Sequence, residues 1–128
     1  MALATLSIVQ GTQSYDNTQK RITMYCQVQL SSPTATYPAG GIPLDSVLLS
    51  DPGVTTNSGV KWTDIRSDTG SGYIYQRIPS TGTMMILQVP PNGSLTTAAP
   101  LQQIPSSLNL QGVYNDIIAV RATFLRNA

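Results

Sequence analysis

The chain has 128 residues, of which only 7 are basic and 6 acidic, and it contains neither histidine nor glutamate. This length predicts a single domain over 1–128, large enough to bury a core of its own. The net charge of +1 excludes the clustered lysines and arginines that bind nucleic acid or acidic membranes, so we expect neither as a partner. A surface built from neutral polar side chains also favours self-association.

The N-terminal part of the chain shows one weak and one strong strand pattern. Residues 3–9 alternate weakly, and 1–18 is also suited to an extended arm. The strong pattern is RITMYCQVQL, 21–30, in which apolar and polar residues alternate. Side chains point to opposite faces along a strand, so this pattern predicts a half-buried strand. Cys26 lies on its apolar face, where we expect it to act as a small hydrophobic residue.

A turn-rich stretch, PAGGIP, follows at 38–43. Glycine is the residue that adopts positive φ without steric cost. We therefore expect both Gly40 and Gly41 to have backbone angles that other residues adopt with strain.

The second half of the chain contains three further strand patterns. GYIYQRI and TMMILQV predict a hairpin over 72–89, joined by the Pro79-Ser80-Thr81-Gly82 loop. We expect 60–66 (VKWTDIR) to be its partner strand. The tail, 116–126, is apolar on both faces and predicts a central strand.

The longest connection, 90–112, is rich in Pro, Thr and Gln, and only LQQI (101–104) indicates a helical turn there. Several short strands separated by turns, with no long helical pattern, predict an all-β fold. We expect a single-domain β-sandwich or barrel with extended loops or arms.

The stretch SDTGSG, 67–72, contains Asp68-Thr69-Gly70-Ser71, the tetrad that carries the catalytic carboxylate of retroviral-type aspartic proteases. That chemistry needs the carboxylate on a dry, rigid loop after an apolar strand. Here Arg66 and Ser67 precede it. Ser, Asp, Thr and Gly are also common turn residues, so we interpret the stretch as a turn between two strands.

The composition also limits cofactors and catalysis. Without histidine, a Ser-His or Cys-His nucleophile cannot form within one chain. With a single cysteine and no glutamate, zinc and EF-hand calcium sites lack their usual ligands. We expect no cofactor, no metal site and no catalytic residues.

Tyr73 and Tyr75 alternate along one predicted strand and are followed by Arg77. This arrangement is typical of a stacking platform for a sugar or a single-stranded nucleic acid. It is equally typical of an aromatic cluster between strands, or of a protein interface, where Tyr and Arg are enriched. The near-neutral charge favours the second interpretation.

Two stretches resemble small capsid-associated proteins of tailed bacteriophages. The first, YPAGGIPLDS at 37–46, combines an aromatic residue with a Pro-x-Gly-Gly-Ile motif. The second, GYIYQRIPSTGTMMIL at 72–87, combines an aromatic strand, a Pro-x-Thr-Gly loop and an apolar strand. The tail, with its core at 117–124, follows in the same order. The residues that carry the resemblance are Tyr37, Pro38, Gly40, Gly41, Ile42, Pro43 and Leu44, then Gly72, Tyr73, Pro79, Thr81 and Gly82.

The resemblance implies a head decoration or cement protein, present on the capsid surface of the virion after synthesis in the host cytoplasm. It implies the major capsid protein as partner, assembly into a dimer or trimer, and no active site. Candidate interface residues are Tyr37, Pro38, Gly40, Gly41, Ile42, Tyr73, Tyr75 and Arg77. With so few charges, we expect the contacts with the capsid to tolerate salt.

Three other functions stay open. One is a different virion component, such as a tail or baseplate module. Another is an aspartic protease that uses Asp68, and the third is a carbohydrate-binding module that uses Tyr73 and Tyr75.

Overall fold

The computed structural model describes residues 3–54, 56, 59–70, 73–88, 102–104 and 110–125. In chain order the elements are β1 Leu6–Ile8, β2 Ser14–Asn17, β3 Arg21–Leu30, β4 Ile42–Pro43, α1 Asp45–Leu49, β5 Val60–Ser67, β6 Ile74–Ile78, β7 Thr83–Gln88, β8 Gln102–Gln103, α2 Gln111–Tyr114 and β9 Ile118–Leu125. The all-β prediction is confirmed, with two antiparallel sheets that do not close into a barrel. No helix in the described ranges is long and apolar enough to cross a membrane.

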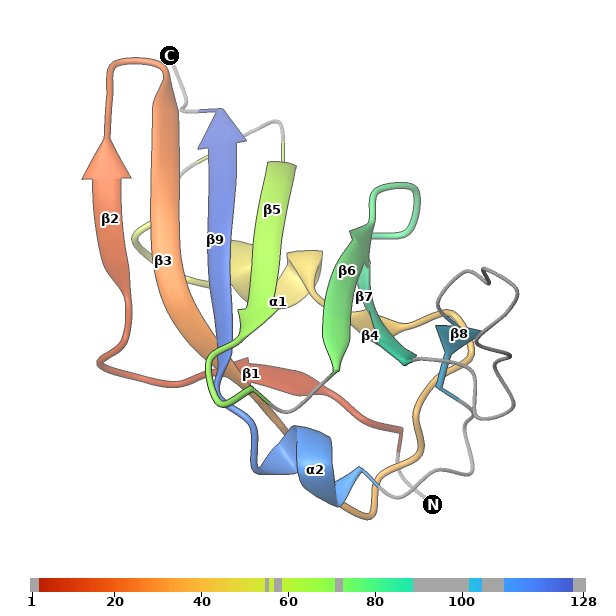
Figure 1. Cartoon of the computed structure of the whole chain (residues 1–128). Coiled ribbons are helices and arrows are strands. Elements are labelled where there is room, and N and C mark those ends of the chain that lie inside the picture. Colours follow the sequence, from red (N-terminus) through yellow and green to blue (C-terminus); the bar gives the residue numbers. More distant parts are fainter. Residues whose placement is uncertain are drawn as a thin grey trace, which may run out of the picture.

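The larger sheet is organised around β3 and β9 (Figure 1). They pair antiparallel from Arg21↔Leu125 to Val28↔Ile118. β1 and β2 pair with successive halves of the far edge of β3, and β5 pairs with the other side of β9. As the period-two patterns predicted, 21–30 is a strand with every second residue buried, and the C-terminal strand is central.

The smaller sheet consists of β4, β7 and β6, with β8 on the end of β7. Its centre is the predicted hairpin, in which Ile74↔Leu87 to Ile78↔Thr83 pair across the loop at 79–82. Gly82 in that loop has φ +67, the conformation for which glycine is favoured.

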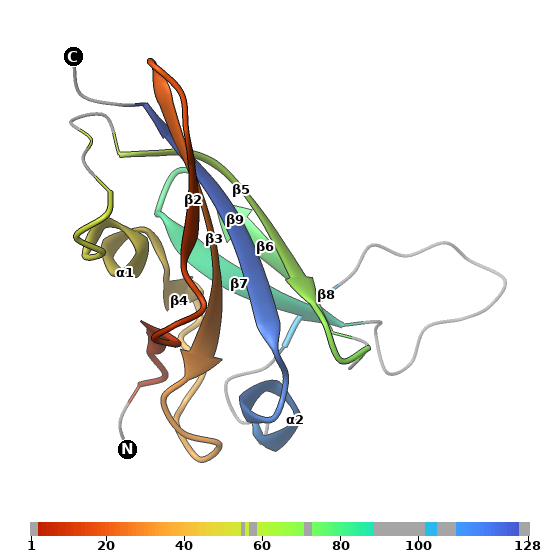
Figure 2. The ribbon, with the colours of Figure 1, turned by 90° about the vertical axis from the view of Figure 1, so that its left-hand side faces the viewer.

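The core lies between the two sheets and α1. Figures 1 and 2 agree that α1 lies on one side of the larger sheet. The largest fully buried side chains come from both sheets, α1 and the connections: Tyr37, Phe124, Met24, Leu30, Ile42, Leu44, Leu48, Met84, Ile86, Leu110, Ile118 and Val28. Each contributes roughly 1.5–3 kcal/mol relative to an exposed position. This face of the larger sheet is called the inner face below.

The opposite, outer face of the larger sheet is solvent-exposed. Alternate residues of β3 that point outward, such as Arg21, Tyr25 and Gln29, are exposed. Tyr25 and Trp62 are each 42% exposed. Among the described elements, none lies over this face in Figure 1.

Three expectations about local structure were wrong. The segment 60–66 pairs with β9 and not with the hairpin, because the chain changes sheets between β5 and β6. Residues 3–17 do not extend as an arm, since β1 and β2 belong to the larger sheet and Leu6 is buried. Within LQQI, Gln102 and Gln103 pair with β7 as a short strand and form no helical turn.

The turn before β4 requires one glycine of the pair. Gly41 has φ +91, and a Cβ there would lie 2.9 Å from the Met84 carbonyl oxygen. Gly40 has no positive φ, and a Cβ there would meet no atom within 4 Å. The expectation of unusual backbone angles is therefore confirmed for Gly41 and wrong for Gly40.

We predict that Gly41→Ala lowers the free energy of unfolding by about 1–3 kcal/mol, because it adds both backbone strain and a contact with β7. Gly40→Ala is the matched control and should change it by less than about 0.5 kcal/mol. Denaturant titration of the two variants measures this difference. Equal stability of the two proteins would contradict the asymmetry of the turn.

Candidate functional site

Tyr37 and Ile42, predicted as interface residues, are buried in the core. The Tyr37 hydroxyl accepts hydrogen bonds from the Ile86 amide at 3.2 Å and from Gln103 Nε2 at 2.5 Å. The Pro38 carbonyl accepts the Gly41 amide at 2.9 Å. Tyr37 thus connects the turn at 38–41 to β7 and β8 by hydrogen bonds.

Arg77, another predicted interface residue, forms an ion pair with Asp45 of the same chain. Its guanidinium donates to both carboxylate oxygens of Asp45, Nε to Oδ1 at 2.8 Å and Nη2 to Oδ2 at 2.6 Å. These hydrogen bonds raise the pKa of Arg77 above its usual value. The Gly82 carbonyl accepts the amides of Leu44 and Asp45, each at 3.0 Å.

The two stretches that carry the phage resemblance, 37–46 and 72–87, therefore contact each other directly. The β4–β7 pairing, with Ile42↔Met84 and Pro43↔Thr83, joins them along the sheet. The Asp45–Arg77 ion pair joins them at the start of α1. What the sequence presents as two separate motifs is one structural unit that builds the smaller sheet.

A buried carboxylate, Asp116, lies where β5, β6 and β9 meet. Its Oδ1 accepts hydrogen bonds from Ser67 Oγ at 2.8 Å and Thr69 Oγ1 at 2.5 Å. Its Oδ2 accepts the Tyr75 hydroxyl at 2.6 Å. Hydroxyl donors to an ionised carboxylate give strong hydrogen bonds, so this cluster ties the larger sheet to the smaller one.

The stretch 67–70 forms the predicted turn between two strands. Gly70 has φ +72, and the Asp68 amide donates to the Ile117 carbonyl at 2.8 Å. The Asp68 side chain is exposed and forms an ion pair with Arg66 at 3.0 Å. This setting differs from the dry environment that an aspartic protease carboxylate needs. Ser71 and Gly72 lie outside the described residues.

Of the two interpretations of Tyr73 and Tyr75, the buried positions of these residues agree with the aromatic cluster between strands, which the charge favoured. Tyr75 is only 4% exposed, because its ring belongs to the core and its hydroxyl binds Asp116. Tyr73 is half-buried and packs against the core. The Tyr75 ring therefore offers no open face of the kind on which a sugar or a base stacks.

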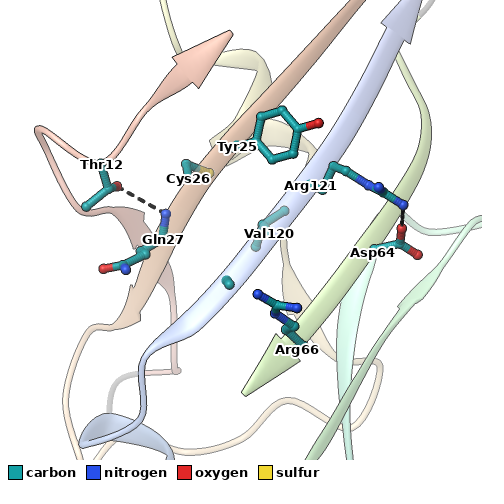
Figure 3. A pocket seen from close by; sticks show the side chains of 9 residues that line it. Thr12, Tyr25, Cys26, Gln27, Asp64, Arg66, Val120 and Arg121 are labelled. Atoms are coloured by element: carbon teal, nitrogen blue, oxygen red, sulfur yellow. Dashed lines mark hydrogen bonds and ion pairs between the residues drawn. The ribbon is translucent and has the colours of Figure 1, made fainter. Parts of the chain in front are cut away.

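Exposed aromatic side chains occur instead on the outer face of the larger sheet. The register places Tyr25, Arg121 and Asp64 in one row across β3, β9 and β5, and Arg121 forms an ion pair with Asp64. A pocket of about 570 Å³ lies at this row, and Figure 3 shows the side chains that line it. Its lining comprises Thr12, Tyr25, Cys26, Gln27, Asp64, Arg66, Ala119, Val120 and Arg121.

The next row of the outer face holds Trp62. It pairs in register with Thr123, whose own partner on β3 is Thr23. The Arg21 guanidinium lies 5.1 Å from the centre of the Trp62 ring, a cation–π distance. Thr123 is buried although it belongs to the outer face, so the side chains around it cover it.

Cys26 illustrates the difference between the two faces of β3. Its side chain is on the buried face, next to the exposed Tyr25. Burial raises the pKa of the Cys26 thiol to about 11. The neutral thiol therefore predominates at neutral pH, and its role is that of a core residue, as predicted.

Comparison with models of protein families, with curated protein sequences and with solved structures finds no match for this chain.

The outer-face residues were missed by sequence reasoning, although one signal for them was present. The polar face of 21–30 already grouped Arg21, Tyr25 and Gln27. Which strand lies beside them could not be read from the sequence. Trp62 and Arg121 therefore joined the group only through the β3–β9–β5 register.

We predict that Asp116→Asn lowers the free energy of unfolding by about 2–3 kcal/mol, because it removes the charge that three hydroxyls solvate in a buried position. Asp68→Asn is the matched control, and its exposed ion pair should cost less than about 1 kcal/mol. Thermal and denaturant unfolding of both variants provide the comparison. A stable Asp116→Asn protein would show that the cluster does not hold the sheets together.

Proposed function

We propose that the protein is a virion structural protein that decorates a phage head and stabilises it by binding several major capsid protein subunits. The observation that carries this proposal is the open outer face of the larger sheet, with Trp62, Tyr25 and three arginines on it. Trp, Tyr and Arg are the residues that contribute most binding energy in protein interfaces. A sheet covered on one face by its core and open on the other is a rigid platform for such contacts.

The resemblance to capsid-associated proteins supports the same proposal. Its two stretches, 37–46 and 72–87, form one contiguous unit in the fold. The contacts of that unit lie within the chain, so its role is to stabilise the fold. The outer face of the larger sheet is therefore the surface that we assign to a partner.

The size of the outer face favours an oligomer. Four strands side by side are about 19 Å wide, and the eight residue pairs of β3 and β9 span about 27 Å. The projected area is therefore about 500 Å², which limits a single copy to an interface of at most about the standard size, roughly 800 Å² of accessible surface per partner. A dimer or trimer that binds several lattice positions at once would gain further affinity by avidity.

The proposal is tested with heads assembled from the capsid protein of the same phage in the absence of this chain. We expect the added protein to sediment with these heads, to saturate at a fixed ratio to capsid subunits, and to raise their disruption temperature. Isolated tails of the same phage are the control. Binding to tails alone would replace the head assignment by a tail or baseplate module, and binding to neither would contradict a virion role.

A further inference from the structure

The charged residues of this chain are sorted between the two halves of the fold. In the part of the chain that the structure describes, the exposed charged residues lie on the larger sheet and the turns that adjoin it: Asp16, Lys20, Arg21, Lys61, Asp64, Arg66, Asp68 and Arg121. The other described charges are internal. Asp45 and Arg77 bind each other, and Asp51 and Asp116 are buried.

The internal group has three carboxylates and one cation. Two of the carboxylates accept hydrogen bonds from hydroxyl groups and have no cation as partner among these internal residues. Tyr15 donates its hydroxyl to both oxygens of Asp51 at 2.7 Å, as Ser67, Thr69 and Tyr75 do for Asp116. The consequence is an excess of cations on the larger sheet. Its eight exposed charged residues comprise five cations and three anions, a surplus of two in a chain whose net charge is only +1.

One surplus cation contacts an exposed aromatic ring, and the other two are its neighbours or the neighbours of that ring in the sequence. Arg66 and Arg121 are paired with Asp68 and Asp64. Arg21 lies over Trp62, Lys61 is next to Trp62 at the irregular register of β5, and Lys20 precedes β3 in the turn from β2. Trp62 therefore has Arg21 over its ring and Lys61 beside it in the chain. Asp16 lies at the far end of the same row, opposite Thr23.

We propose that this surface, the outer face of the larger sheet around Trp62 and Tyr25, docks onto a protein surface rich in carboxylates. The inference rests on the proposed function, in which that partner surface belongs to the capsid lattice, and it specifies the partner's chemistry. Charge complementarity orients the encounter, and burial of the two rings supplies the affinity. The half built from the smaller sheet, in which Arg77 is paired with Asp45, faces away from the lattice.

Three other occupants fit the surface less well. A second copy docked face to face would bring together two surfaces of the same charge. A nucleic acid needs several cations that neutralise successive phosphates, and the surplus on this surface is only two charges. A sugar ring stacks on a free aromatic face, and Arg21 lies over one face of Trp62.

Head binding tests the charge argument with two matched variants. At about 50 mM salt, where surface charges are weakly screened, Lys20→Gln/Lys61→Gln should bind heads about fivefold more weakly. Asp16→Asn removes one charge of the opposite sign from the same sheet, and it should bind as tightly as the natural protein or more tightly. Added salt should weaken the natural protein more than the double variant. The low charge content by itself predicts that binding to the capsid tolerates salt. The grouping of cations on one sheet predicts instead that added salt weakens binding measurably.

A second arm does not depend on the heads. Trp62 is the single tryptophan of the chain, so its indole N–H gives one identifiable signal in nitrogen-15 NMR. A poly-glutamate peptide should shift this signal, and the double variant should reduce the shift. An oligonucleotide of deoxythymidine, a maltose oligosaccharide and a dilution series of the protein alone are the parallel probes.

The outcomes separate the two proposals. A peptide-induced shift without head binding would support the acidic-partner inference and contradict the capsid role. Head binding that is equal for all variants, with no shift of the indole signal, would support the capsid role and overturn the inference. A larger shift with the oligonucleotide, the sugar or increasing protein concentration would also overturn it, in favour of that occupant.

Discussion

The antiparallel pairing of β3 with β9 is the interaction on which the rest of the structure depends. It aligns two apolar faces, with Met24 opposite Ala122 and Cys26 opposite Val120, and so creates one surface that must be covered. The smaller sheet and α1 cover it, and their buried residues form the core. Because side chains alternate along a strand, the same pairing fixes what the opposite face presents to solvent. The interior and the candidate interface therefore have a common origin.

Scarcity of charge links the interior to the surface. With 6 acidic and 7 basic residues, every carboxylate that is buried inside the fold makes the net charge of the surface more positive. Asp51 and Asp116 are buried and held by hydroxyl groups, which satisfy a carboxylate without using a cation. The cations thus remain on the larger sheet. A nearly neutral chain acquires in this way a positive face that neither its net charge nor any charge run in its sequence reveals.

Sequence reasoning predicted the features that depend on local pattern. The alternation in 21–30, the loop at 79–82 and the apolar tail predicted two strands and a hairpin that the structure contains. Sequence reasoning failed for features that depend on contacts between residues far apart in the chain. The polar and apolar pattern of β5 does not indicate that β9 is its neighbour in the sheet. The Tyr75 hydroxyl is bound inside the fold by Asp116, which is 41 residues away in the sequence. The stretch 67–70 was correctly interpreted as a turn, but no spacing rule predicted that the Ser67 and Thr69 hydroxyls bind Asp116.

The central claim is that the outer face of the larger sheet is the surface through which the protein acts. Hydroxyl-radical footprinting of the protein, free and bound to heads, tests it most directly. Trp62 and Tyr25 should be oxidised several-fold more slowly on the head, whereas Tyr15, 40% exposed near α1, should react at a similar rate in both states. Unchanged oxidation of Trp62 and Tyr25 in fully bound protein would contradict the account.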